Sequence, residues 1–153
     1  MVSVPKRIMV ALAAHENEKP VIEQAVLLSN KFGAQLIAIH VHQPVLSQPK
    51  GDSELNVTEE MIRNLFTEYG FEQIINDLEI IISKGEDIAK KIQEHSNNID
   101  ILVVGHKKMG GFMSWITDSI DEDITDLMSC PVLVVPESTH TQNNKFSKKE
   151  STS

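Results

Sequence analysis

Five short apolar runs alternate with segments of helical periodicity, and this alternation limits the fold more than any other feature of the sequence. Each run is continuous and rich in β-branched residues, which is typical of strands buried on both faces of a sheet. The runs occupy residues 8–12, 36–41, 80–82 with their flanks, 101–104 and 132–135. We therefore expect five buried strands.

Helical patterns fill the spaces between these runs. Pro20 suits a first helical turn, apolar residues recur at helical spacing to Phe32, and Gly33 predicts the end of this helix. Thr58 can cap a second helix, which Gly70 breaks or kinks. The remaining two patterns cover residues 88–98 and 119–128. Strands that alternate with helices form right-handed crossovers, so we predict an α/β fold with three layers, α/β/α, around a parallel sheet.

Length and composition fit one domain. The 153 residues are 41% hydrophobic and 24% charged, which is ordinary globular usage and enough for a core without disulfides or metals. The net charge of -8 disfavours general binding to nucleic acid or to an anionic membrane. The amino-terminal apolar stretch is too short for a signal peptide or a membrane span. The single Cys130 excludes an internal disulfide, so we expect a cytoplasmic protein.

Two segments break both periodicities. Residues 43–57 contain Pro44, Pro49 and Gly51, which predicts a long exposed loop. Residues 137–153 are mainly polar, with Phe146 as their one aromatic residue, which predicts a flexible tail. The expected organisation is one domain over residues 1–136, followed by this tail.

The fourth apolar run opens into glycines. It reads Val103-Val104-Gly105-His106-Lys107-Lys108-Met109-Gly110-Gly111, and Ser119 then begins a helical pattern. Such a passage from strand to glycine to helix start can build a phosphate site, because glycine lets backbone N–H groups approach an anion. A short glycine pattern is also a common way simply to end a strand.

Through this glycine segment and its flanks, the chain resembles the universal stress protein family over residues 7–136. The resemblance also includes His40-Val41 and the ending Ser129-Cys130-Pro131-Val132-Leu133-Val134-Val135-Pro136. It implies a five-stranded parallel sheet in the order 3-2-1-4-5, with nucleotide across the crevice between strands one and four in members that bind ATP. It further implies Val41, Gly105 and Ser119 as cofactor-binding positions; Lys107 is added because of its charge.

The chain departs from the pattern of ATP-binding members at three positions. Lys108 and Asp118 stand where that pattern has glycines, and Asp118 brings negative charge to the place where phosphate would bind. Ala13 stands where those members carry an aspartate that contacts the nucleoside, and a methyl group cannot accept a hydrogen bond. The chain therefore looks more like the branch of the family that lacks the ATP motif and works as a dimer, although ATP or AMP binding stays open.

Other candidate sites rest on histidine and cysteine. His15, His40, His42 and His106 all follow or end strands, so they can gather at the carboxyl edge of the sheet and hold a metal. No close-spaced ligand pair supports this, and individually hydrogen-bonded histidines are the expectation, with no metal. Cys130 precedes a proline at a strand entrance, where an inert thiol is expected.

The resulting hypothesis is a non-enzymatic stress-response protein, without catalytic residues, that binds unknown protein partners. The alternative is an adenine-nucleotide switch with slow ATP hydrolysis. In the strand order that the resemblance implies, the fifth strand is an edge, and an apolar edge invites pairing with another chain. We expect a homodimer through Val132, Leu133, Val134 and Val135, with Val132 of one copy near Val135 of the other. Neither nucleic acid nor membrane is an expected partner.

Overall fold

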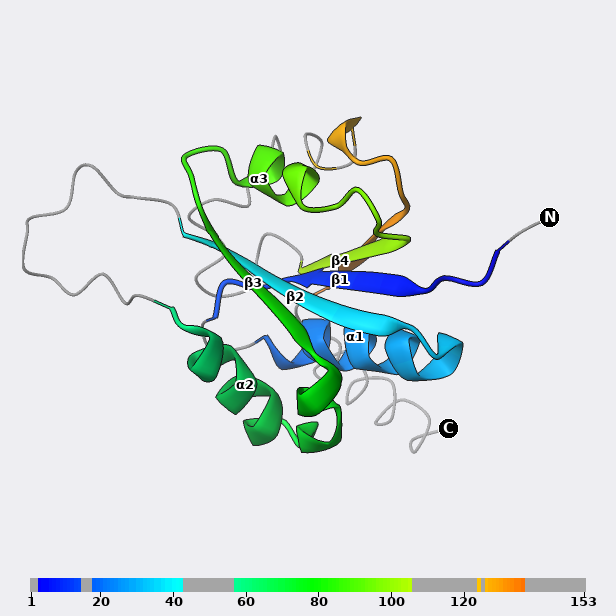
Figure 1. The fold of residues 1–153 in the computed structure, drawn as a ribbon, viewed down its shortest axis with the longest axis vertical. Coiled ribbons are helices and arrows are strands. Elements are labelled where there is room, and N and C mark those ends of the chain that lie inside the picture. Colours follow the sequence, from blue (N-terminus) through cyan, green and yellow to red (C-terminus); the bar gives the residue numbers. More distant parts are fainter. Residues whose placement is uncertain (1–2, 15–17, 43–56, 106–123, 125, 137–153) are drawn as a thin grey trace, which may run out of the picture.

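The computed structural model describes residues 3–14, 18–42, 57–105, 124 and 126–136, and these form one five-stranded parallel sheet flanked by helices (Figure 1). The strands lie in the order β3-β2-β1-β4-β5, which confirms the expected fold and strand order. Their bounds are β1 (Arg7–Ala11), β2 (Gln35–His42), β3 (Glu79–Lys84), β4 (Ile101–Gly105) and β5 (Val132–Val135). The tail at 137–153 and most of the predicted loop and fourth helix lie outside the described residues.

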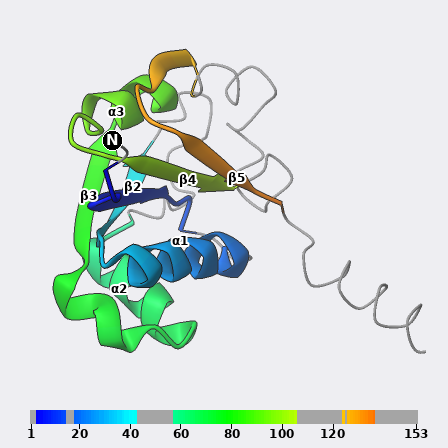
Figure 2. The same ribbon diagram turned by 90° about the vertical axis from the view of Figure 1, so that its right-hand side faces the viewer.

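The helices cover both faces of the sheet. Helices α1 (Lys19–Phe32) and α2 (Glu59–Glu68) lie on one face, and α3 (Ile88–Glu94) lies on the other (Figures 1 and 2). Successive side chains of a strand point to opposite faces of the sheet and so pack in different layers. Ile8 and Val10 of β1 belong to the core beneath α1 and α2, whereas Met9 belongs to the core beneath α3. The three-layer prediction is confirmed.

Helix ends follow the local sequence signals. Thr58 caps α2 by accepting a hydrogen bond from the Met61 backbone N–H at 3.2 Å. Gly33 ends α1 with a left-handed φ of 62°, a conformation that glycine adopts without steric cost. At Gly70 the chain does more than kink: α2 ends, and a separate 3-10 helix, η1 (Glu72–Asp77), follows.

The third helix is shorter than predicted. We expected it to end at residues 97–98, but α3 ends at Glu94. The backbone N–H of Ser96 binds the Gln93 carbonyl, and the Ser96 hydroxyl donates to the same oxygen at 2.7 Å. A serine that hydrogen-bonds the nearby backbone offers an alternative to continued helix, which explains the early end.

Candidate functional site

The space beyond the carboxyl end of β1 is the candidate site. Strand β1 pairs with β2 on one side and with β4 on the other, so the strand order reverses between β1 and β4. In open parallel α/β sheets, ligands bind outside the carboxyl ends of the strands at such a reversal. Strands β2 and β4 extend beyond the β1 pairing, which ends at Ala11 with Ile39 and at Val10 with Val103.

Two of the four predicted cofactor-binding positions border this space. Val41 lies near the end of β2, and Gly105 is the last residue of β4. Because β1 separates their strands, and neighbouring strands are about 4.8 Å apart, the two positions lie roughly 10 Å apart across the sheet. Lys107 and Ser119 lie outside the described residues, as do Lys108 and Asp118.

Val41 offers its backbone rather than its side chain. The side chain is 6% exposed and packs in the core beneath α3. The Leu12 N–H donates to the Ile39 carbonyl at 2.9 Å, so the backbone groups of Ile39 face β1. Alternate strand residues direct their N–H and C=O groups to the same side, and those of Val41 therefore face the space beyond β1.

Gly105 faces the same space from the other side. The Leu102 N–H donates to the Pro131 carbonyl at 3.0 Å, which directs the backbone of Leu102 toward β5. The backbone of Gly105, three residues later, therefore points toward β1. Peptide groups of β2 and β4 thus flank one gap at the point where the strand order reverses.

A buried carboxylate lies at the end of β1, where the sequence predicted none. Glu18 is 3% exposed, and its Oε1 accepts a hydrogen bond from the Ala13 backbone N–H. Glu18 is the N-cap residue of α1, but its side chain makes no cap hydrogen bond and turns back to β1. Between these two residues Ala14 adopts a left-handed φ of 63°, which is uncommon outside glycine.

His40 binds the other side of the same peptide group. Its ring is largely buried, and Nδ1 lies 2.9 Å from the Leu12 carbonyl oxygen. A carbonyl oxygen can only accept, so Nδ1 carries the proton and donates. The Leu12 C=O and the Ala13 N–H point in opposite directions because the peptide is trans. The carbonyl faces β2, so the Ala13 N–H and the Glu18 carboxylate lie on the β4 side of β1.

The site therefore differs from its sequence-based outline. Ala13 removes one carboxylate, as expected, but Glu18 supplies another from five residues later. The sequence signal was present in the acidic residue directly before Lys19-Pro20, where the helix begins. The prediction missed Glu18 because an acid at a helix start is expected to interact with the helix dipole rather than turn back to a strand.

The described geometry supports neither a metal site nor a reactive cysteine. Within the ranges that the structure describes, no group of three or more His, Cys, Asp or Glu side chains is placed to hold a metal ion. His15 and His106 fall outside those ranges. Burial is the main cause that raises the pKa of the Cys130 thiol, which favours the unreactive protonated form. No helix in the described part of the chain is long and apolar enough to cross a bilayer.

Comparison with known proteins identifies the family. The sequence profile of the universal stress protein family matches residues 5–136. No curated protein sequence matches the chain. Among solved structures, a universal stress protein in complex with cAMP superimposes with a TM-score of 0.64 at 16% identity, covering 89% of this chain and 100% of that one.

Two further structures are similar. A universal stress protein family protein from Arabidopsis thaliana with AMP bound gives a TM-score of 0.55 at 20% identity, covering 88% of this chain and 94% of that one. The universal stress protein UspA from Lactobacillus plantarum gives 0.56 at 17% identity, covering 85% and 97%. At these identities the structures show a shared fold, while the profile match spans most of the chain. The chain belongs to the universal stress protein family.

Proposed function

We propose that this universal stress protein is a non-enzymatic, cytoplasmic homodimer that acts by binding partner proteins. The observation that carries the dimer is the edge position of β5, beside which the described residues place no further strand. This strand pairs with β4 and ends the sheet, and Leu133 and Val134 are 38% and 39% exposed. An apolar edge strand presents N–H and C=O groups to another chain, and a two-fold contact between two such edges closes on itself.

Backbone directions favour one register for the proposed dimer. The Pro131 carbonyl faces β4, so alternation directs the peptide groups of Val132 and Val134 outward. In antiparallel pairing these residues oppose each other, with Val132 of one copy opposite Val134 of the other and Leu133 on the axis. This differs by one residue from the sequence-based expectation of Val132 near Val135. A contact centred on Val134 instead would oppose Val132 and Pro136, and proline has no N–H to donate.

The dimer is tested by light scattering at micromolar concentration on the wild type, Val134→Pro and Val134→Thr. Val134→Pro removes an outward N–H and should give a monomer. Val134→Thr is the matched control, because it keeps the N–H and the β-branched shape, and should stay dimeric. A monomeric wild type, or an unchanged mass for Val134→Pro, would show that β5 is not the interface.

The described polar groups at the carboxyl edge support a role other than catalysis. Glu18 and His40 both bind the Leu12–Ala13 peptide, so they position the end of β1. A general base or nucleophile pair would instead direct its reactive atoms at a substrate. Incubation of the purified protein with ATP tests the proposal: phosphate release that Glu18→Gln abolishes would identify an enzyme.

Adenine-nucleotide binding in the gap beyond β1 is the second candidate function. The outward-facing peptides of Val41 and Gly105 favour it, since backbone N–H and C=O groups can bind a base edge and an anion. Similar structures hold cAMP and AMP. Against tight ATP binding stands Glu18, because a carboxylate on the β4 side of β1 repels the phosphates of a triphosphate.

Calorimetric titration with adenosine, AMP and ATP separates these effects. We expect ATP to bind more weakly than about 10 μM, a free energy of roughly 7 kcal/mol. Glu18→Gln keeps an oxygen that can accept from the Ala13 N–H but removes the charge, and it should strengthen ATP binding several-fold while leaving adenosine unchanged. Tight ATP binding to the wild type would instead favour the nucleotide switch.

A further inference from the structure

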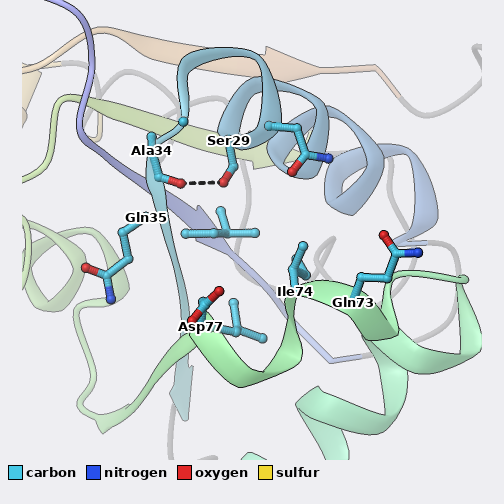
Figure 3. Close-up of a pocket in the computed structure, with 10 residues that line it drawn as sticks. Ser29, Ala34, Gln35, Gln73, Ile74 and Asp77 are labelled. Carbon is cyan, nitrogen blue, oxygen red and sulfur yellow. Dashed lines mark hydrogen bonds between the residues drawn. The ribbon is translucent and has the colours of Figure 1, made fainter.

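A hollow of about 210 Å³ lies beside the amino end of β2, at the end of the sheet opposite the candidate nucleotide site (Figure 3). It is bordered by the end of α1, the start of β2 and the 3-10 helix η1. Leu36 and Leu78 are almost fully buried, and with half-buried Ile74 they form an apolar floor. The exposed side chains of Gln73 and Asp77 stand on the rim.

Two features beside this hollow carry negative charge. Helix α1 ends here, with the Asn30 and Ser29 carbonyls accepting from the backbone of Gly33 and Ala34. A helix carboxyl end carries partial negative charge, which favours a nearby cation. The 3-10 helix also ends here, at Asp77. Among the described residues that line the hollow, Asp77 is the one with a charged side chain.

The basic side chains nearby are held by other groups. Arg7 donates to Gln35 Oε1 at 2.8 Å and pairs with Glu79 at 3.4 Å. Arg63 donates to the Ile75 carbonyl at 3.0 Å. Lys31, in the last turn of α1, does not line the hollow. The Arg7 guanidinium touches one lining residue, Gln35, but its charge is paired with Glu79. Within the described chain Asp77 makes no ion pair that would compete for a cation.

We propose that this hollow binds a small aliphatic ammonium ion. The ammonium group lies against the Asp77 carboxylate, and the alkyl chain covers Leu36, Ile74 and Leu78. A hollow of about 210 Å³ lies below the usual range for drug-sized ligands, so it suits a short alkyl chain and is too small for a nucleotide. The net charge of -8 further favours a cation over an anion.

The test is a titration of the ¹⁵N-labelled full chain with hexylammonium, followed through backbone amide shifts. We expect saturable shifts centred on Ala34, Gln73 and Asp77, with a dissociation constant near 1 mM, which corresponds to about 4 kcal/mol. Hexan-1-ol, which has the same chain without the charge, should bind more weakly. Equal binding of the alcohol, or the absence of saturable shifts at these amides, would overturn the proposal.

Two variants and a matched control locate the site. Asp77→Asn should weaken hexylammonium binding up to about fivefold, the usual range for an exposed charge pair. Glu72→Gln removes one carboxylate from the same 3-10 helix but outside the hollow, and should leave binding unchanged. Gln73→Trp places a large ring at the rim and should block binding, with folding checked by circular dichroism. If Asp77→Asn and Glu72→Gln weaken hexylammonium binding equally, the protein's overall charge rather than a site at Asp77 explains the binding, and the proposal is wrong.

Discussion

At each end of β1 a carboxylate accepts hydrogen bonds from the backbone, but one carboxylate is exposed and the other is buried. At the amino end, the Asp100 carboxylate accepts hydrogen bonds from the backbone N–H groups of Lys6 and Arg7 at 2.8 and 3.0 Å. At the carboxyl end, the Glu18 carboxylate accepts from the Ala13 N–H. Asp100 is exposed, whereas Glu18 is 3% exposed. Asp100 therefore holds the amino end of β1 through solvent-exposed hydrogen bonds, and Glu18 holds the carboxyl end through a buried one.

This difference in burial decides what each carboxylate contributes. Water can replace Asp100 as the acceptor for two exposed N–H groups, so its contribution to stability is small. Water does not reach the Ala13 N–H freely, and a buried donor left without an acceptor costs its full desolvation free energy. The buried carboxylate also lies where the strand order reverses, so its charge bears on ligand binding, whereas that of Asp100 does not.

The largest effect is expected at Glu18. Glu18→Ala leaves the Ala13 N–H without its acceptor and should lower the free energy of unfolding by about 2 kcal/mol, measured by urea denaturation at pH 7. Glu18→Gln retains an acceptor oxygen, so its loss should be clearly smaller. If Glu18→Ala and Glu18→Gln lose the same stability, the charge of Glu18 rather than its hydrogen bond stabilises this end of β1.

His40 should show the next largest effect. His40→Phe keeps an aromatic ring of similar size but removes the donor to the Leu12 carbonyl, and should cost about 1 kcal/mol in the same assay. His42→Phe is the matched control, because His42 lies on the same strand and is only half-buried. A greater loss at His42 would mean that the hydrogen bond to β1 contributes little.

The fold was predictable because hydrophobic patterning is a local signal. All five apolar runs became strands, and Gly33 and Thr58 ended and began helices as expected. Strand ends moved by a residue or two, as at β1, which begins at Arg7 instead of Ile8. The α3 end was missed because Ser96 hydrogen-bonds the Gln93 carbonyl, and no periodicity reveals that choice.

The candidate site was only partly predictable, because it depends on contacts between distant backbone groups. Val41 and Gly105 follow from strand ends and family resemblance, and the structure places both beside the gap beyond β1. Glu18 escaped because a carboxylate can bind either its own helix or a preceding strand. The outward direction of the Val134 peptide depends on the register with β4, which strand limits alone do not determine.

At the amino end of β1, Asp100→Ala should cost less than about 1 kcal/mol at pH 7, since exposed N–H groups regain water. Asp100→Asn, which keeps one acceptor oxygen, should cost less still. Urea denaturation of both variants checks this. A loss at Asp100 as large as that at Glu18 would mean that burial does not separate the two ends of the strand.

The smallest expected effect is the pH dependence of the stability lost in Asp100→Ala. Hydrogen bonds from the backbone N–H of Lys6 and, to a smaller extent, of Arg7 hold the pKa of Asp100 below its ordinary value of 3.8. A carboxyl whose folded pKa is lowered stabilises the protein fully above its unfolded pKa, and this contribution is lost as pH falls through the folded pKa. The stability difference between wild type and Asp100→Ala should therefore be constant from pH 7 to pH 5 and shrink below about pH 4. Urea midpoints at pH 7, 5 and 3 measure it, and a difference that persists unchanged at pH 3 would show that the Asp100 charge does not fasten β1.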